Sequence, residues 1–215
     1  MRQFTFGASL DYIENSAGRV ETRVAQVRFE TEFENSDRFA ADVQQSHELL
    51  RQPFNLTPTV TIPIAGYEFR DVYVSYSMGE QRPVSGTVSL QRGEYFDGHL
   101  TAVTYQRARI ELTPRLSVQP GLSINRIELP EADVTLKLVT SRVTYTVTPR
   151  MFVSTLVQYN SGVSSLSANF RFRWEYQPGS EFFLVYNDQR DTSVRGTPLL
   201  QNRAFIVKLT RQFRL

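Results

Sequence analysis

Apolar and polar residues alternate along most of this chain. The clearest case is SLSANFRFRWEY, from Ser165 to Tyr176, in which even positions are apolar or aromatic and odd positions are polar or charged. Because successive side chains of a β-strand point to opposite faces, the segment predicts a strand with one apolar and one charged face. It has the roughly 9 to 11 residues that a tilted strand needs to cross a bilayer, and it ends in Trp174 and Tyr176, residues typical of a membrane boundary.

Turn-forming residues divide the chain into about twelve such segments. We expect strands near 4–12, 19–34, 38–52, 67–78, 84–91, 99–112, 116–127, 134–147, 151–159, 165–176, 181–187 and 201–215. Every second link is short (NSD, GEQRP, TPR, TPR, QPGS), whereas the others include the two longest, 52–66 and 188–200. Short turns at one end and longer loops at the other are typical of outer-membrane barrels.

The predicted fold class is therefore all-β, an antiparallel transmembrane β-barrel of about 12 strands in this chain. We predict a single barrel domain over residues 1–215, which is either a whole barrel or the C-terminal part of a larger one. A soluble sandwich also alternates, so a soluble all-β binding protein of sandwich or open-barrel form is the alternative.

Three stretches depart from the simple pattern. Residues 41–51 also fit a helical turn or two, and residues 52–66 are expected to form a long irregular connection. In the eighth segment the apolar residues change from even positions, ending at Leu138, to odd positions, beginning at Val143. This change predicts a β-bulge near residues 139–142, because one extra residue moves side chains to the other face.

The composition limits the alternatives only in part. The chain has 215 residues, 40% of them hydrophobic, and a mean hydropathy of −0.32, but lipid-facing and lumen-facing residues average out in barrel strands. The longest clean apolar run, Phe182 to Tyr186, is too short for a transmembrane helix. The absence of cysteine excludes disulfides and thiolate metal sites.

The start of the chain lacks an export signal, whereas its end has the pattern of an exported barrel protein. Met1 leads directly into an alternating segment without an export signal, so we expect the chain to be the end of a longer precursor or a truncated gene model; a cytosolic β protein is the alternative. The closing AFIVKLTRQFRL has the alternation of a final barrel strand, the kind of segment that barrel assembly machinery binds. Arg211 falls on its apolar parity and is expected near the membrane interface, because arginine at the midplane costs roughly 2 to 4 kcal/mol.

Several phrases resemble the C-terminal β-barrel domain, of unknown function, of bacterial outer-membrane proteins that often carry an N-terminal module like the family 9 carbohydrate-binding domains. The phrases are LLRQPFNLTPTVTIPIAGYEF, RGEYFDG, LSVQPGLSINRIELP, RVTYTVTPRMFVSTLVQYNSG, FRFRWEYQPGSEFFLVYNDQRDT and RAFIVKLTRQFRL, over most of residues 45–215. The resemblance implies an outer-membrane location and an N-terminal soluble module missing from this chain. It implies no reaction that can be assigned to particular residues.

A catalytic site has little support. An outer-membrane hydrolase would need a histidine between a nucleophile and an orienting group, and only His47, near Ser46, and His99 are available. No nucleophile-elbow spacing accompanies either histidine. We therefore predict no catalytic residue and keep the hydrolase as a third option.

Metal, cofactor and nucleic-acid sites are not predicted either. Asn187, Asp188 and Asp191 could offer oxygen ligands to calcium, but they lack the spacing of a calcium loop, and turn formation explains them. The formal net charge is +2, and the basic residues follow the strands rather than gather in a patch, so no nucleic-acid partner is expected.

Charged residues oppose the apolar parity on four segments and form a predicted belt in the lumen. The belt consists of Glu30, Glu32, Arg107, Arg109, Glu111, Arg171, Arg173, Glu175 and Lys208. The belt has two interpretations: acids and bases pair across strands and fill a narrow interior, or its arginines form a constriction that selects anions. Because acids and bases are about equally numerous, paired fill or weak selectivity is favoured.

The opposite parity predicts contact with outer-membrane lipid. The lipid-facing and interface aromatics are Phe170, Phe172, Trp174, Tyr176, Phe205 and Phe213. We therefore expect a protein of the bacterial outer membrane that acts as a pore or as a membrane anchor for an exported, glycan-related module.

Overall fold

The computed structural model describes residues 1–57, 59–194, 196 and 198–213, and all regular elements in this part of the chain are β-strands. They are β1 (Gln3–Glu14), β2 (Val20–Glu32), β3 (Arg38–Leu49), β4 (Phe54–Thr57), β5 (Val60–Ile62), β6 (Gly66–Met78), β7 (Val84–Tyr95), β8 (Gly98–Thr113), β9 (Leu116–Glu128), β10 (Asp133–Thr148), β11 (Met151–Asn160), β12 (Ser165–Gln177), β13 (Ser180–Asp191) and β14 (Leu199–Thr210). Among the described residues there is no helix with the length and apolar character to span a membrane.

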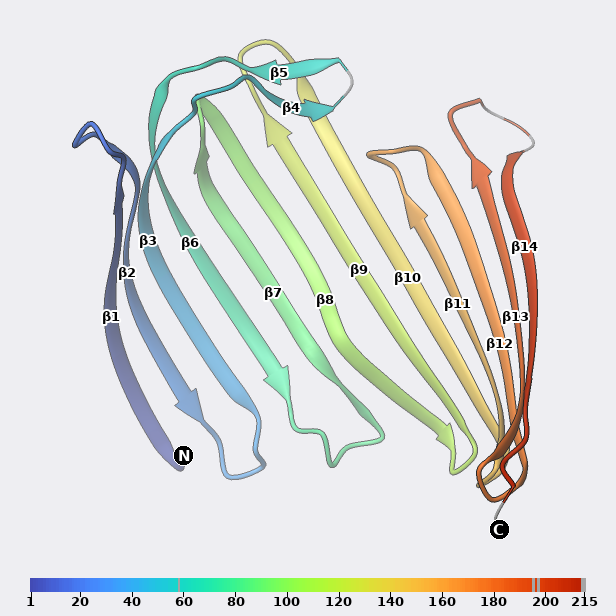
Figure 1. Ribbon diagram of the computed structural model, residues 1–215. Helices are drawn as coiled ribbons and strands as arrows, with labels where there is room; N and C mark the ends of the chain where they lie inside the picture. The colour runs from blue at the N-terminus through green and yellow to red at the C-terminus, as the bar shows by residue number, and fades with distance from the viewer. Residues whose placement is uncertain (58, 195, 197, 214–215) are drawn as a thin grey trace. The chain divides into compact units, whose positions relative to one another are not determined.

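Twelve of these strands form one sheet, in the order β1-β2-β3-β6-β7-β8-β9-β10-β11-β12-β13-β14, whereas β4 and β5 pair with each other (Figure 1). Each strand pair with an assigned register is antiparallel. The predicted all-β, antiparallel class is confirmed, and the twelve predicted segments correspond to the twelve strands of this sheet. The third segment forms strand β3, so its helical interpretation is wrong.

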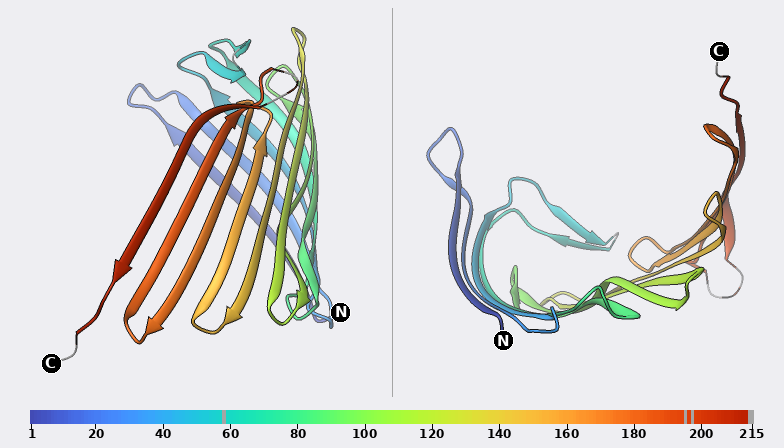
Figure 2. Two further views of the ribbon diagram at one scale, coloured as in Figure 1. Left: turned by 90° about the vertical axis from the view of Figure 1, so that its right-hand side faces the viewer. Right: turned by 90° about the horizontal axis from the view of Figure 1, so that it is seen from below.

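The chain divides into two units, and each is described by itself. Unit 1 comprises residues 1–82, 86–106 and 123–136, and unit 2 comprises residues 83–85, 107–122 and 137–215. Strands β1 to β6 lie wholly in unit 1 and β11 to β14 wholly in unit 2, and their hairpins can be followed in the two views of Figure 2.

In unit 2 the strand register gathers apolar side chains on one face, which we call its apolar face. Phe172 pairs with Val153 of β11 and with Leu184 of β13, and Leu184 pairs with Val207 of β14. Val207 is 51% exposed and Leu209, on the same face, is 69% exposed. Side chains of the other parity form the polar face.

The same arrangement holds in unit 1. Val27 of β2 pairs with Ala8 of β1 and Val43 of β3, and Val43 pairs with Val72 of β6. Val27 and Val43 are 62% and 58% exposed. Cross-strand apolar pairs of this kind stabilise a sheet, and here they leave its apolar face uncovered by other described elements of the unit.

The stretch 52–66 is not merely irregular, because it contains the hairpin β4–β5, which supplies one side of a small core in unit 1. The buried members of this core are Val60, Ile62, Tyr67, Phe96, Ile127 and Leu129. On β6 the core residue Tyr67 points to the same face as Asp71, and on β9 the core residue Ile127 points to the same face as Asn125. That face is the polar one, so the hairpin covers the polar face of the sheet. Figure 2 shows β4 and β5 folded over the concave side of β3 and β6.

This core corrects the prediction of a β-bulge in β10. Residues 138–146 of β10 pair with β11 in one continuous register, and the register of this pair shifts only between Thr146 and Thr148. The change of parity has another cause. Val134 and Leu136 are apolar on the polar-face parity because they pack against the hairpin core, whereas Val143 and Tyr145 belong to the apolar face.

Two turns of unit 1 are joined through Asp37, whose side chain is 1% exposed. Its carboxylate accepts hydrogen bonds from the Tyr76 hydroxyl at 2.5 Å and the Gly79 amide at 2.8 Å, and Arg82 pairs with it at 2.8 Å. The Tyr76 and Gly79 hydrogen bonds, with Arg82 nearby, hold the pKa of Asp37 below its usual value. The β2–β3 and β6–β7 connections are thereby fixed to each other.

The hairpin core yields a stability prediction. Ile62 is 2% exposed, so Ile62→Ala should leave a cavity and destabilise the hairpin by about 2 to 5 kcal/mol. We expect faster proteolytic cleavage within residues 52–66 than in the wild type. Thr61→Ala, which changes an exposed neighbour, is the matched control and should cleave at the wild-type rate; equal rates for both variants would contradict the core.

Asp37 yields a prediction of pH dependence. Because its pKa is lower in the folded than in the unfolded chain, its contribution to stability is present above the ordinary carboxyl pKa of about 3.9 and is lost as the pH falls below it. Asp37→Asn should therefore lower the thermal unfolding midpoint at neutral pH, and the difference from wild type should shrink in acid. Glu34→Gln, at an exposed position near the same turn, is the control; a difference that is independent of pH would refute the assignment.

Candidate functional site

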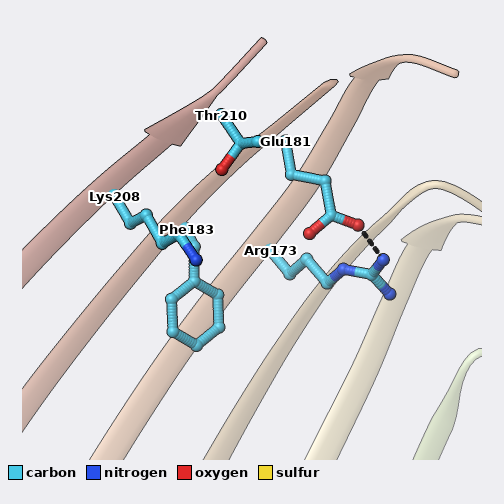
Figure 3. Close-up of a pocket in the computed structure, with 5 residues that line it drawn as sticks. All are labelled: Arg173, Glu181, Phe183, Lys208 and Thr210. Atoms are coloured by element: carbon cyan, nitrogen blue, oxygen red, sulfur yellow. Dashed lines mark hydrogen bonds and ion pairs between the residues drawn. The ribbon is translucent and has the colours of Figure 1, made fainter. Parts of the chain in front are cut away.

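A hollow of about 260 Å³ lies on unit 2 and is lined by Arg173, Glu181, Phe183, Lys208 and Thr210. The five residues come from three adjacent strands, β12, β13 and β14 (Figure 3). In the register of these strands Arg173 pairs with Phe183 and Phe183 pairs with Lys208, so the hollow opens on the polar face. Two residues of the predicted belt, Arg173 and Lys208, therefore meet in one place.

Arg173 is held from two sides. Its guanidinium forms an ion pair and hydrogen bond with Glu181, which Figure 3 marks with a dashed line. On the other side it lies 6.0 Å from the ring centroid of Phe152, a distance at which a cation and an aromatic ring attract each other. The position of its charge is thus determined by β11 and β13 together.

Lys208 differs from Arg173 in its surroundings. Among the described residues no ion pair or hydrogen bond of its ammonium group is recorded, and it lies beside Phe183 (Figure 3). Arg171, one pleat further along β12, donates a hydrogen bond from Nε to the neutral side chain of Asn169 at 2.8 Å. The hollow and its neighbour Arg171 therefore carry more positive than negative charge.

Sequence reasoning missed Glu181 and Phe183 as part of this site. Both lie on β13, where the sequence shows mainly the apolar run from Phe182 to Tyr186. Their parity could be read from the sequence, but their place beside Arg173 follows from the register of β12 and β13.

The remaining belt residues of unit 2 are Arg107, Arg109, Glu111 and Glu175, of which two form an ion pair with each other. Arg109 and Glu111 of β8 form an ion pair at 2.8 Å, and the Glu175 carboxylate accepts a hydrogen bond from the Gly179 amide at 3.2 Å. Arg107 adopts a left-handed backbone conformation, with φ of 52°, which is uncommon for a residue other than glycine.

Glu30 and Glu32 lie on the polar face of unit 1. Glu30 pairs with Arg28 at 2.8 Å, and Glu32 lies within 3.5 Å of Arg2 and Arg38. Because these two acids and the other belt residues belong to different units, the continuous belt stays a prediction.

Hydrogen bonds between neighbouring strands fill the polar face of unit 1. Asp42, 3% exposed, accepts a hydrogen bond from Gln26 at 2.9 Å and lies 3.4 Å from a guanidinium nitrogen of Arg28. Gln91 donates to Asp71 at 3.0 Å. Asp42 therefore has a cationic partner and Asp71 a neutral one, and the Asp42–Arg28 pair favours the interpretation of paired fill in this unit.

The predicted aromatics of β12 and β14 lie on the apolar face of unit 2. Phe170, Phe172 and Trp174 pair there with Tyr186, Leu184 and Phe182 of β13, and Phe205 is 64% exposed. Tyr176 donates a hydrogen bond to the Thr210 carbonyl at 3.1 Å. Phe213 follows the end of β14, and the Arg211 guanidinium lies 4.9 Å from its ring centroid.

The candidate residues for catalysis and for calcium binding have other partners in the described part of the chain. His47 lies 3.6 Å from Glu68 on the apolar-face parity, whereas Ser46 points to the opposite face and bonds with Gln44. Asp188 forms hydrogen bonds and ion pairs with Arg190 and Arg203, at 2.6 and 2.8 Å.

Comparison with known proteins gives a limited result. No protein-family model matches the sequence, and no curated protein sequence matches it significantly. Two solved structures resemble the fold. "KdgM porin in complex with disordered oligogalacturonate" has a TM-score of 0.33 and 12% sequence identity, and the match covers 78% of this chain and 84% of that chain. "KdgM porin" has a TM-score of 0.31 and 12% sequence identity, and the match covers 86% of this chain and 89% of that chain. TM-scores below 0.5 do not identify a solute for this chain.

The class that the fold defines is nonetheless clear from the chain itself. It is an all-β protein whose main sheet follows the chain from strand to antiparallel strand, interrupted once by a hairpin, which is the connectivity of an up-and-down barrel wall. The resemblance to the barrel domain of carbohydrate-module proteins stays a prediction.

Proposed function

We propose that this chain forms a β-barrel of the bacterial outer membrane and acts as a pore for small hydrophilic solutes, with a weak preference for anions. The observation that carries the proposal is the contrast between the two faces of each unit. One face exposes large apolar side chains, and the other places charged and hydroxyl side chains in a hydrogen-bonded network.

The exposed apolar face favours a membrane over a soluble sandwich. Soluble proteins rarely leave large contiguous apolar patches open, and a sandwich would cover this face with a second sheet. Here the only second layer described within unit 1 is the hairpin β4–β5, and it lies on the polar face. A lipid environment satisfies the apolar face without any further layer.

Charged residues bound the apolar face at the long-loop end of each unit, and this pattern supports the same proposal. In unit 2 Asp188, Arg190 and Arg203 cluster on the apolar-face parity. In unit 1 Arg23 and His47 lie near Glu68, at 3.2 and 3.6 Å. Trp174 and Tyr176 lie near the other end of unit 2. A band of apolar residues between polar and aromatic borders is typical of transmembrane barrel strands.

The hollow on unit 2 supports the anion preference. Glu181 forms an ion pair with Arg173 and also attracts Lys208, so one acid faces two bases in the hollow. The excess of one positive charge in the hollow attracts anions and repels cations, and the surrounding acid–base pairs keep the effect small. Anchoring of an exported module is the competing role, and the barrel assembly machinery would recognise β14 in either case.

The membrane-facing assignment can be tested at two adjacent positions of β14. Val207 and Ile206 are both 51% exposed but point to opposite faces. Val207→Arg should destabilise the protein in lipid by roughly 2 to 4 kcal/mol, the cost of arginine at the midplane of a barrel, and Ile206→Arg should cost much less. The measurement is urea unfolding in phospholipid vesicles; equal small effects at both positions would indicate that the apolar face contacts water.

The pore and its preference can be tested by conductance in planar bilayers. We expect ion conduction by the purified protein and an anion-to-cation permeability ratio above one. Lys208→Gln should lower this ratio and Glu181→Gln should raise it, because each removes one charge from the hollow.

Lys137→Gln is the matched control for these variants. Lys137 lies on β10 and points to the same, apolar face as Val139, so the variant removes one positive charge away from the hollow. It should leave the anion-to-cation permeability ratio unchanged. Absence of conductance in the wild type would favour the anchor. Conductance with no response to Lys208→Gln would leave the pore standing and overturn the anion preference.

A further inference from the structure

The hairpin β4–β5 is attached to the polar face through side chains of four different parts of unit 1. Val60 and Ile62, 7% and 2% exposed, point toward Tyr67 of β6, Phe96 after β7 and Ile127 of β9. Val134 and Leu136 of β10 pack against the same core. A connection that served only to join β3 to β6 would need none of these contacts.

Aromatic packing and hydrogen bonds fix the hairpin β4–β5 to the sheet in one position. The ring of Phe54, on β4, lies 6.0 Å from that of Phe96, centroid to centroid. Phe96 is itself held edge to face by Tyr67 at 5.0 Å and by Tyr95 at 4.7 Å. Two hydrogen bonds hold the C-terminal end of the segment, because the Tyr67 hydroxyl donates to the Pro63 carbonyl at 2.9 Å and the Leu50 amide donates to the Ala65 carbonyl at 3.0 Å. Interlocked aromatic packing of this kind holds one arrangement rather than several.

The other side of the hairpin is polar and uncharged. Asn55 and Thr61 are exposed, and the Thr61 hydroxyl donates to the Asn55 side-chain oxygen at 2.7 Å. Thr59, also exposed, lies 3.2 Å from Thr57 between hydroxyl oxygens. The sequence from residue 52 to residue 66 contains no Asp, Glu, Lys or Arg, unlike the polar face that the hairpin covers.

We infer that the hairpin β4–β5 is a fixed constriction at the long-loop end of the pore, whose exposed Asn55 and Thr61 side chains line the path of the solute. The inference rests on the proposed pore function. Because the hairpin lies over the polar face, it narrows the route along that face. Because its exposed groups are an amide and hydroxyls, solutes that pass the hairpin exchange neutral hydrogen bonds there.

The test uses the absence of cysteine in the natural chain. Thr61→Cys introduces one thiol at an exposed position that supports no core contact, so the variant should fold like the wild type. Single-channel current is recorded before and after addition of the negatively charged reagent 2-sulfonatoethyl methanethiosulfonate. We expect a stepwise loss of current and a lower anion-to-cation permeability ratio after modification.

Ser16→Cys, in the exposed β1–β2 turn, is the control and should react without a change of current. A second variant, in which a Gly-Ser linker of equal length replaces residues 54–62, removes the apolar anchor and should raise single-channel conductance. Unchanged current after modification of Thr61→Cys, together with unchanged conductance of the linker variant, would overturn the constriction while leaving the pore intact. A wild-type protein that does not conduct would instead refute the pore function itself.

Discussion

The antiparallel register is the constraint on which the rest of this structure depends. Side chains alternate with a period of two, so a slip of one residue between neighbouring strands would move a whole apolar set to the polar face. In unit 2 the register from β11 to β14 aligns Val153, Phe172, Leu184 and Val207 in one row. The same register brings Arg173, Phe183 and Lys208 together on the other side. The apolar face and the charged hollow are therefore two results of one set of backbone hydrogen bonds.

Much of the fold was predictable because alternation and turn chemistry are local properties of the sequence. The twelve strands of the main sheet were located by their parity and by links such as TPR and QPGS. The hairpin β4–β5 was not, because two strands of four and three residues are too short to display a period. Its core joins Ile62 to Ile127, and no local pattern connects positions so far apart.

The error in β10 has the same origin. Apolar residues on the polar-face parity can mean a bulge or a second buried surface, and the sequence of one strand does not distinguish them. Val134 and Leu136 are apolar because a distant hairpin covers them. In the candidate site, Arg173 and Lys208 were predicted from parity, but Glu181 and Phe183 needed the pairing of β12 with β13. Parity gives the face of a side chain, whereas register gives its neighbours.

The core under β4–β5 has a consequence for how the protein responds to its surroundings. Its six buried residues are shielded from water by protein atoms alone, whereas Val27, Val43 and Val72 on the opposite face have no protein cover within unit 1. The sheet of unit 1 thus has two hydrophobic regions, one covered by the hairpin and one left uncovered by protein. In the membrane location proposed for this protein, the thickness and composition of the lipid act on the uncovered surface, whereas the hairpin core depends on the packing of its own side chains.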